Sequence, residues 1–220
     1  MARNVFISIG GSLGGDIVGQ SISGMRGVDG SGGACEEKRE LAAFDRLQSS
    51  LPGNIDVLKG DRWGVVVRAD DNIVPLIRTE VSGAVLKISA AGSFSTRTPI
   101  RLTLTVAGDF PDADILGSGD LTFLGVDQKH LAVNLQGAGD AYLSGAVEKL
   151  DLKVMGSGDV HAERLLSKDL KVSLMGSGDI DAHAGESVDI ALMGSGDVRG
   201  SGSPSKVRSS ALGSGDVTVR

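Results

Sequence analysis

Apolar residues occupy every second position along the C-terminal half of this chain. They flank a recurring glycine-rich tetrad on both sides. Two residues before each tetrad stand Ile115, Leu135, Val154, Leu174, Leu192 and Ala211, and directly after it stand Leu121, Ala141, Val160, Ile180, Val198 and Val217. A period of two is typical of β-strands, whereas an amphipathic helix needs a period of 3.6 residues. The pattern therefore predicts short strands with one buried face.

The tetrad reads Gly-Ser-Gly-Asp, or Gly-Ala-Gly-Asp in its second copy, and its first glycines lie 18 to 20 residues apart. The parity of the flanking strands places both glycines inward and the Ser and Asp outward. Inward glycines permit a sharp bend or a close backbone approach. The predicted structural turns therefore carry these first glycines and aspartates: Gly117, Asp120, Gly137, Asp140, Gly156, Asp159, Gly176, Asp179, Gly194, Asp197, Gly213 and Asp216.

A unit of about 19 residues cannot bury its own apolar face, but stacked units share one continuous core. Coils stacked at roughly 4.8 Å form parallel ladders. The sequence therefore predicts an all-β fold, a single-stranded parallel β-helix. A right-handed solenoid is expected, because parallel crossovers are almost always right-handed.

The N-terminal half lacks the tetrad but keeps the strand pattern over residues 54–58, 63–68, 84–89 and 100–106. A short helical piece is expected over residues 73–77, with Asn72 as its cap. Residues 1–29 are interpreted as a Gly-rich leader or loosely formed segment. Residues 30–220 then form one β-helix domain, with irregular capping coils over 30–107 and regular repeats over 108–220.

Composition and charge argue against several classes of function. The net charge is −6, and no basic stripe of the kind that nucleic-acid binding requires is present. The longest apolar stretch, residues 73–77, is far shorter than the roughly 20 residues of a membrane helix, so no transmembrane span is expected. Cys35 is the only cysteine, which excludes an intrachain disulfide. The first apolar stretch is too short for a clear signal peptide.

The sequence shows no recognisable group of catalytic residues. The histidines, His130, His161 and His183, are scattered, and no nucleophile elbow, zinc-protease motif or phosphate loop occurs. We therefore expect no enzyme and no catalytic, cofactor-binding or metal-binding residues. Polysaccharide-active β-helix enzymes remain a distant alternative, although Trp63 and Tyr142 are the only Trp and Tyr available as sugar platforms.

The six aspartates of the tetrads should stack about 5 Å apart, and each pair should repel by roughly 1 kcal/mol in water. We expect each carboxylate to accept backbone N–H groups within its own turn. Calcium bound between coils is the alternative, prompted by the similarity to calcium-binding Gly-Gly-x-Gly-x-Asp repeats. Those occur twice per coil and this tetrad occurs once, so no cofactor is expected.

Residues 30–220 resemble the bacterial "putative auto-transporter adhesin, head GIN domain" family, a domain of unknown function. The resemblance rests on Gly30-Ser31-Gly32, Glu36 to Glu40, Phe44 to Leu47, Asn54 to Val57, Ala69 to Pro75 and the serial tetrads. It implies a β-helix and an extracytoplasmic location, in the periplasm, outer membrane or cell surface. The expected function is a non-enzymatic surface module whose solenoid face binds a protein or glycan. A structural spacer or assembly unit of the envelope is the alternative.

Overall fold

A computed structural model describes residues 27–220, and strands make up 68% of it against 2% helix. The all-β prediction is confirmed. Of the predicted leader, residues 1–26 lie outside the described residues, and Val28–Asp29 form strand β1, which pairs with β8. None of the helices within residues 27–220 is long and apolar enough to cross a membrane.

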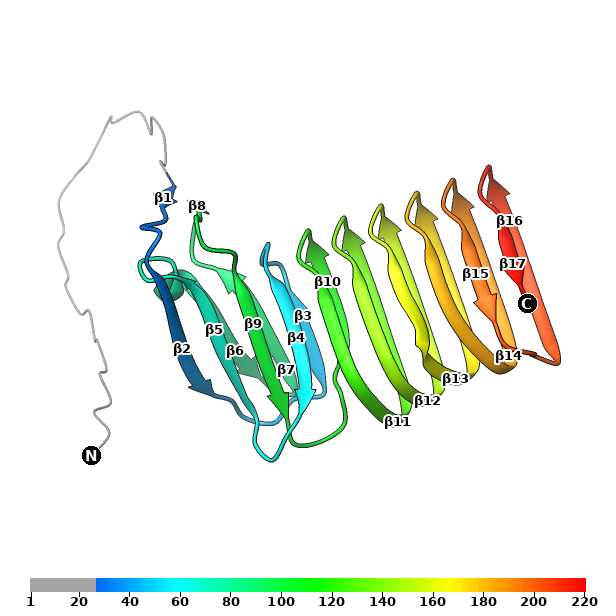
Figure 1. The fold of residues 1–220 in the computed structure, drawn as a ribbon, viewed down its shortest axis with the longest axis horizontal. Coiled ribbons are helices and arrows are strands. Elements are labelled where there is room, and N and C mark those ends of the chain that lie inside the picture. Colours follow the sequence, from blue (N-terminus) through cyan, green and yellow to red (C-terminus); the bar gives the residue numbers. More distant parts are fainter. Residues whose placement is uncertain (1–26) are drawn as a thin grey trace.

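The repeats form a β-solenoid of about five turns, seen as the row of stacked coils in Figure 1. Each of the long strands β11 to β14 bends once and pairs in parallel with the next coil along both of its arms. The tetrads therefore stack in register, so that Gly156 pairs with Gly176 and Gly176 with Gly194. The strands of this part are β10 (Asp112–Gly117), β11 (Leu121–Gly137), β12 (Ala141–Gly156), β13 (Val160–Gly176), β14 (Ile180–Gly194), β15 (Val198–Ser201), β16 (Lys206–Gly213) and β17 (Val217–Val219).

The apolar positions of the repeat face the interior, as their period predicts. Leu174 and Ile180, on either side of one tetrad, are both 0% exposed, whereas Ser173 lies on the outer side. One core cluster extends from Phe44 to Val198 and so continues through both halves of the chain. Stacking of small aliphatic side chains from successive coils builds this core.

The prediction that both glycines of a tetrad point inward is wrong for the first one. The second glycine is buried in the first five tetrads, as at Gly178, whereas the first glycine lies at the corner, partly or fully exposed. The first glycines have φ between +127° and +147°, a backbone conformation that residues other than glycine rarely adopt. This backbone turns the chain from one face to the other and breaks the simple alternation of the strands.

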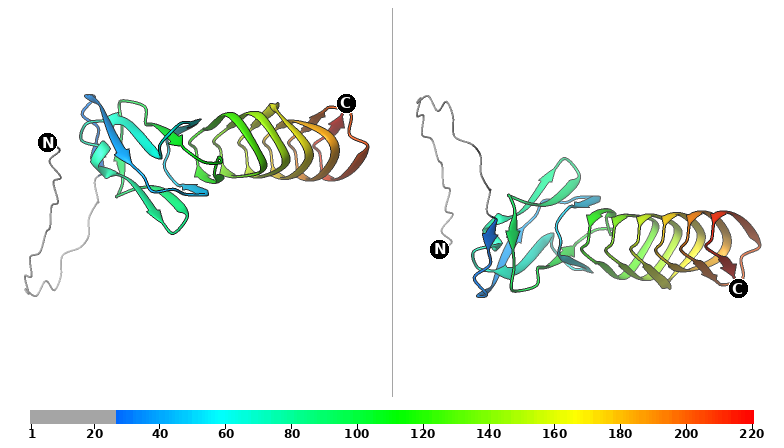
Figure 2. Two further views of the ribbon diagram at one scale, coloured as in Figure 1. Left: turned by 90° about the horizontal axis from the view of Figure 1, so that it is seen from below. Right: turned by 90° about the horizontal axis from the view of Figure 1, so that it is seen from above.

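The N-terminal strands extend the two faces of the solenoid. On one face β10 pairs with β3, which pairs with β7 and then β6; on the other, β11 pairs with β4, then β9, β5 and β2. The outermost pairs, β2 with β5 and β6 with β7, are antiparallel rather than coiled. This half, at one end of the elongated molecule in Figures 1 and 2, comprises β2 (Ala34–Glu40), β3 (Arg46–Ser49), β4 (Asn54–Lys59), β5 (Gly64–Asp70), β6 (Ile77–Ser82), β7 (Val85–Ala90), β8 (Phe94–Ser95) and β9 (Arg101–Val106).

The predicted helical piece is a single 3₁₀ turn, Val74–Leu76, and Asn72 does not cap it. The Asn72 side chain instead accepts a hydrogen bond from the Ser31 N–H (3.0 Å) and donates one to the Asp29 carbonyl (2.8 Å). A long-range contact therefore replaces the expected local one. The Gly30-Ser31-Gly32 and Asp70-Asp71-Asn72 motifs meet in space although about 40 residues separate them.

Asp70 is the buried anchor of this junction, with 0% exposure. Its carboxylate accepts hydrogen bonds from the backbone N–H groups of Arg97 (2.8 Å) and Thr98 (3.1 Å). The hydrogen bond from Thr98 and the backbone bond from Arg97 lower the pKa of Asp70, against the opposing effect of burial. The carboxylate is thus held ionised and ties the loop before β9 to the end of β5.

Candidate functional site

The aspartates of the tetrads join one coil to the next. In five successive pairs the backbone N–H of one aspartate donates to Oδ1 of the aspartate in the preceding coil, as from Asp179 to Asp159 at 2.7 Å. The expectation that each carboxylate bonds within its own turn is therefore wrong. At the corner this N–H points along the solenoid axis, where the carboxylate of the neighbouring coil is the acceptor within reach.

These bonds offset the repulsion within the column of carboxylates, because each of the five accepting carboxylates, from Asp120 to Asp197, faces an N–H dipole. Arg199 neutralises part of what is left. Its guanidinium lies 3.0 Å from Asp197, 3.4 Å from Asp179 and 3.7 Å from Asp181. Desolvation lowers the pKa of Arg199, but the combined effect of these carboxylates is larger and of opposite sign. The pKa of Arg199 therefore lies above its usual value. Within residues 27–220 no group of three or more metal-ligating side chains is close enough to hold a metal ion.

The strands that follow the tetrads present one row of outward side chains, two residues after each aspartate. We call the surface that this row forms, together with the other outward side chains of the same strands, the post-corner face. Adjacent members are paired in the parallel ladder, so they stack from coil to coil. The row reads Thr122, Tyr142, His161, Asp181, Arg199 and Thr218.

Two rings of this row form an aromatic stack. The centroids of Tyr142 and His161 are 4.8 Å apart with an angle of 21° between the ring planes, and Tyr142 is 43% exposed. Partial desolvation of the phenol, followed by the charges of Asp140 and its neighbours in the column, raises the pKa of Tyr142. The phenol therefore stays neutral and can donate a hydrogen bond at physiological pH.

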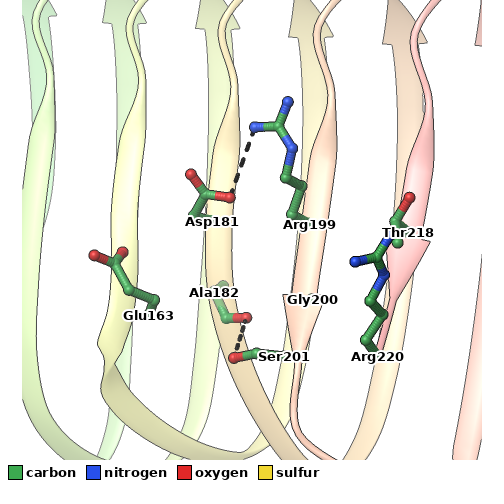
Figure 3. A pocket seen from close by; sticks show the side chains of 8 residues that line it. All are labelled: Glu163, Asp181, Ala182, Arg199, Gly200, Ser201, Thr218 and Arg220. Carbon is green, nitrogen blue, oxygen red and sulfur yellow. Dashed lines mark hydrogen bonds and ion pairs between the residues drawn. The ribbon is translucent and has the colours of Figure 1, made fainter.

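A groove of about 540 Å³ lies on the C-terminal part of this face (Figure 3). The Asp181–Arg199 ion pair forms one of its sides, and the Ser201 hydroxyl, which donates to the Ala182 carbonyl, lies below. Glu163 and Arg220 flank the groove in Figure 3, and neither makes an ion pair within the part of the chain that the structure describes. Charged groups of both signs are thus available to a ligand.

A second depression, of about 340 Å³, lies on the other side of Glu163. Both depressions include Glu163 in their lining, so we describe them together as the post-corner groove. The second one is lined by Leu124, Tyr142, Leu143, Ser144, His161, Glu163 and Arg164. With coils about 4.8 Å apart, the post-corner groove spans roughly 24 Å along the axis from β11 to β17.

The histidines do not form a catalytic group. His161 belongs to the aromatic stack, the Nδ1 atom of His183 lies 3.2 Å from the Ser201 hydroxyl, and His130 pairs with Asp151 at 2.9 Å. In the sequence, the position of His161 carries other residue types in other coils, such as Thr122, Asp181 and Arg199. That variation was the available signal for the post-corner face, because the core and the corner repeat while this row changes.

The family of the chain follows from a comparison with known sequences. Residues 43–204 match the model of the family described as "Putative auto-transporter adhesin, head GIN domain". The chain belongs to this family. The match covers strands β3 to β9 and five of the six tetrads, so the suspected resemblance is confirmed. No curated protein matches the chain.

Solved structures share the fold of this family member. A "putative adhesin" from Bacteroides fragilis is 22% identical, with a TM-score of 0.74, and the match covers 88% of this chain and 100% of that one. A "putative adhesin" from Parabacteroides distasonis is 21% identical, with a TM-score of 0.53 over 88% and 99% of the two chains. A "putative lipid binding protein" from the same species is 17% identical, with a TM-score of 0.54 over 89% and 100%. At these identities the likeness shows a common fold.

Proposed function

We propose that this protein is a non-enzymatic module of the cell envelope or cell surface that binds a glycan or a protein along the post-corner face. The observation that carries the proposal is the contrast between repeated and varied positions. Core and corner residues recur in every coil because stacking requires them. The outward row from Thr122 to Thr218 changes chemistry from coil to coil, which is how a regular scaffold can encode specificity.

A glycan suits the post-corner groove better than a protein surface does. The exposed Tyr142 ring and the half-buried His161 ring stacked on it provide a platform for a sugar, and neighbouring carboxylate, guanidinium and hydroxyl groups can hydrogen-bond sugar hydroxyls. The groove is long and shallow, a shape that fits an extended chain. Descriptions of the family and of its relatives as adhesins are consistent with a surface binding role.

Binding of the full chain to a glycan array and to a panel of matrix and envelope proteins tests the proposal. We expect a glycan ligand whose affinity falls about two- to tenfold in Tyr142→Ala, because stacking on an aromatic ring contributes about 0.5–1.5 kcal/mol. The variant Glu163→Ala should weaken binding as well. Lys171→Ala, an exposed change on the other face of the solenoid, is the matched control and should bind normally.

Equal binding by all three variants would place the ligand elsewhere on the molecule. Absence of binding to every member of both panels would favour a structural spacer. Cell fractionation with an antibody against the chain tests the proposed location independently. Recovery with the periplasmic, outer-membrane or surface fraction is expected.

A further inference from the structure

The N-terminal strands carry a groove of about 600 Å³, which we call the N-terminal groove. It lies over β2 and β5, which pair with each other, and it reaches β9. It shares no lining residue with the post-corner groove. The side chains that give it its chemistry are Lys38, Arg39, Glu40, Arg62, Trp63 and Thr105.

The charge of this groove is opposite in sign to that of the whole chain. Three of its four charged lining residues are cations, whereas the chain as a whole has 22 basic and 28 acidic residues. Lys38 and Arg62 are exposed, and neither makes an ion pair within residues 27–220. Two cations without carboxylate partners attract an anion. Lys38 and Arg62 are therefore available to an anionic ligand.

Arg39, the third cation, has a structural role. Its guanidinium donates hydrogen bonds to the carbonyl oxygens of Val74 (3.0 Å) and Ile77 (2.6 Å). A further bond reaches the Thr79 hydroxyl at 3.1 Å. These bonds tie β2 to the 3₁₀ turn and to β6, and so they fix the strand that carries Lys38. Arg39 shapes the groove, and the two exposed cations remain to bind.

Trp63 supplies an aromatic surface beside these cations. Its ring packs against the buried Phe44, with centroids 4.8 Å apart and an angle of 62° between the ring planes. Its carbonyl accepts a hydrogen bond from the Leu41 N–H at 3.2 Å. Trp63 is thus anchored at the edge of the core while it lines the groove half-buried. An anchored ring with apolar faces is a platform on which a sugar ring can pack.

We propose that the N-terminal groove is a second binding site, which takes an acidic saccharide. Lys38 and Arg62 hold its carboxylate, Trp63 packs against the sugar ring, and Glu40 accepts hydrogen bonds from the sugar hydroxyl groups. An acidic peptide also offers carboxylates, but it has few hydroxyl groups for Glu40 and would bring like charge toward it. The site is separate from the post-corner groove, so it goes beyond the function proposed above.

Both grooves lie on one face of the molecule, far enough apart to be tested separately. Lys38 pairs in register with Val66, which pairs with Thr103. Thr103 pairs with Asp56, and Asp56 with Thr122, the first member of the post-corner row. Side chains paired in this way point to the same side of a sheet. Four strand spacings of about 4.8 Å place β2 roughly 19 Å from β11.

Trp63 is the only tryptophan of the chain, so its fluorescence reports binding in this groove directly. The full chain is titrated with oligogalacturonate and with sialyllactose. Methyl-esterified oligogalacturonate and lactose are the matched neutral sugars. We expect an acidic sugar to change the Trp63 fluorescence and its neutral counterpart to bind at least fivefold more weakly. The affinity for the acidic sugar should fall as the salt concentration rises.

Substitutions of the exposed cations test their role. Lys38→Ala and Arg62→Ala should each raise the dissociation constant about two- to fivefold, the range of exposed ion pairs, and the double variant about tenfold. Lys87→Ala removes an exposed cation of β7, on the other face, and should bind normally. Tyr142→Ala changes the post-corner groove alone and should leave the Trp63 response unchanged. Circular dichroism should show all variants folded, because every substituted side chain is exposed.

Fluorescence that responds to neither acidic sugar would overturn the proposal, as would equal binding of the neutral counterparts. Normal binding by the double variant, or an equal loss in Lys87→Ala, would also overturn it. A response that Tyr142→Ala abolishes would place the acidic sugar in the post-corner groove, against this inference but in support of the proposed function. Tighter binding of an oligoglutamate peptide than of either acidic sugar would overturn the assignment to a saccharide.

Discussion

From the second tetrad onward, both glycines of a tetrad lie so close to the preceding coil that neither has room for a side chain. A Cβ atom built on Gly176 would lie 1.9 Å from the Gly156 carbonyl oxygen, and one on Gly178 would lie 2.0 Å from the Gly158 carbonyl oxygen. The first glycine also has a positive φ, whereas the second does not. At the second glycine the requirement is therefore purely one of space.

Gly178→Ala should destabilise the protein by about 1–3 kcal/mol or more, because the added methyl group meets backbone atoms that cannot move aside. Gly185→Ala is the matched control. Its Cβ would lie 3.5 Å from the nearest atom, an ordinary contact, so its free energy of unfolding should change little. Urea unfolding of both variants measures the difference. Similar stabilities would show that the coils can separate to accept a side chain.

The aspartate column predicts a difference between two substitutions at Asp159, whose Oδ1 accepts the Asp179 N–H. Asp159→Asn keeps an acceptor and reduces repulsion within the column, so a loss of about 0.5 kcal/mol is expected. Asp159→Ala leaves the Asp179 N–H without its partner and should cost about 1–3 kcal/mol. Chemical denaturation of the two variants in parallel measures both values.

Calcium provides the control for this interpretation. If hydrogen bonds between coils hold the column together, the melting temperature of the native protein should be the same in chelator and in millimolar calcium at fixed ionic strength. A cation that binds only the folded state raises stability with its concentration. A calcium-specific rise of several degrees, absent with magnesium, would contradict the hydrogen-bonded account.

At the scale of strands, the sequence was informative for the longer strands with one buried face, whereas the four-residue strand β3 was missed. The strands predicted over 54–58, 63–68, 84–89 and 100–106 correspond to β4, β5, β7 and β9. The strand β2 was missed because it is an edge strand without a buried residue, and its charged side chains show no period of two. The expected helical piece ends where β6 begins, since a proline and a short apolar run do not distinguish a 3₁₀ turn from a strand.

The register of a strand can be tested at two adjacent residues of β13. Leu174 is 0% exposed, and Leu174→Asp would bury a carboxylate without a partner, with an expected cost of about 4 kcal/mol. Ser173→Asp, on the outer side, should change the free energy of unfolding by less than about 0.5 kcal/mol. Guanidinium unfolding curves compare them. Equal destabilisation would be incompatible with the alternation of inner and outer positions.

The junction around Asp70 predicts a dependence of stability on acid. Its pKa is lower in the folded protein than in the unfolded chain, so its stabilising effect is complete above the unfolded value of about 3.9. That effect is lost as the pH falls through the lower, folded pKa. Asp70→Asn should be less stable than the native protein at pH 7, and the difference should shrink below about pH 4.

The free energy of unfolding, measured between pH 2 and pH 7, tests the direction of this pH dependence. Asp61→Asn is the control, because Asp61 is exposed and lies outside the junction. Its stability should follow that of the native protein at every pH. A constant difference between Asp70→Asn and the native protein across this range would show that ionisation of Asp70 does not contribute.

At the scale of the whole molecule, the sequence predicted stacking but not what stacking brings together. The period of about 19 residues implied a solenoid, and about five turns are observed. Hydrogen bonds between coils could not be predicted, because a repeat pattern is the same whether a side chain bonds within its coil or to the next one. The post-corner groove could not be predicted from the sequence either. Its lining residues Glu163, Asp181 and Arg220 come together only when the coils stack in register.

The final prediction concerns the fragment 108–220, which contains the repeats without the N-terminal strands. In the full chain β3 and β4 pair with β10 and β11, and the core is continuous across this boundary. Removing them uncovers buried side chains such as Leu121 and Phe123 and frees the edges of β10 and β11 that β3 and β4 cover. The fragment would then expose a core end that is covered in the full chain.

An uncovered core end with free strand edges invites association. We therefore expect the fragment to melt at a lower temperature than the full chain and to associate more strongly as its concentration rises. Light scattering across a dilution series measures the mass of the species that form, with the full chain as the control. A monomeric fragment that melts like the full chain would instead show that the repeats fold and close without their N-terminal strands.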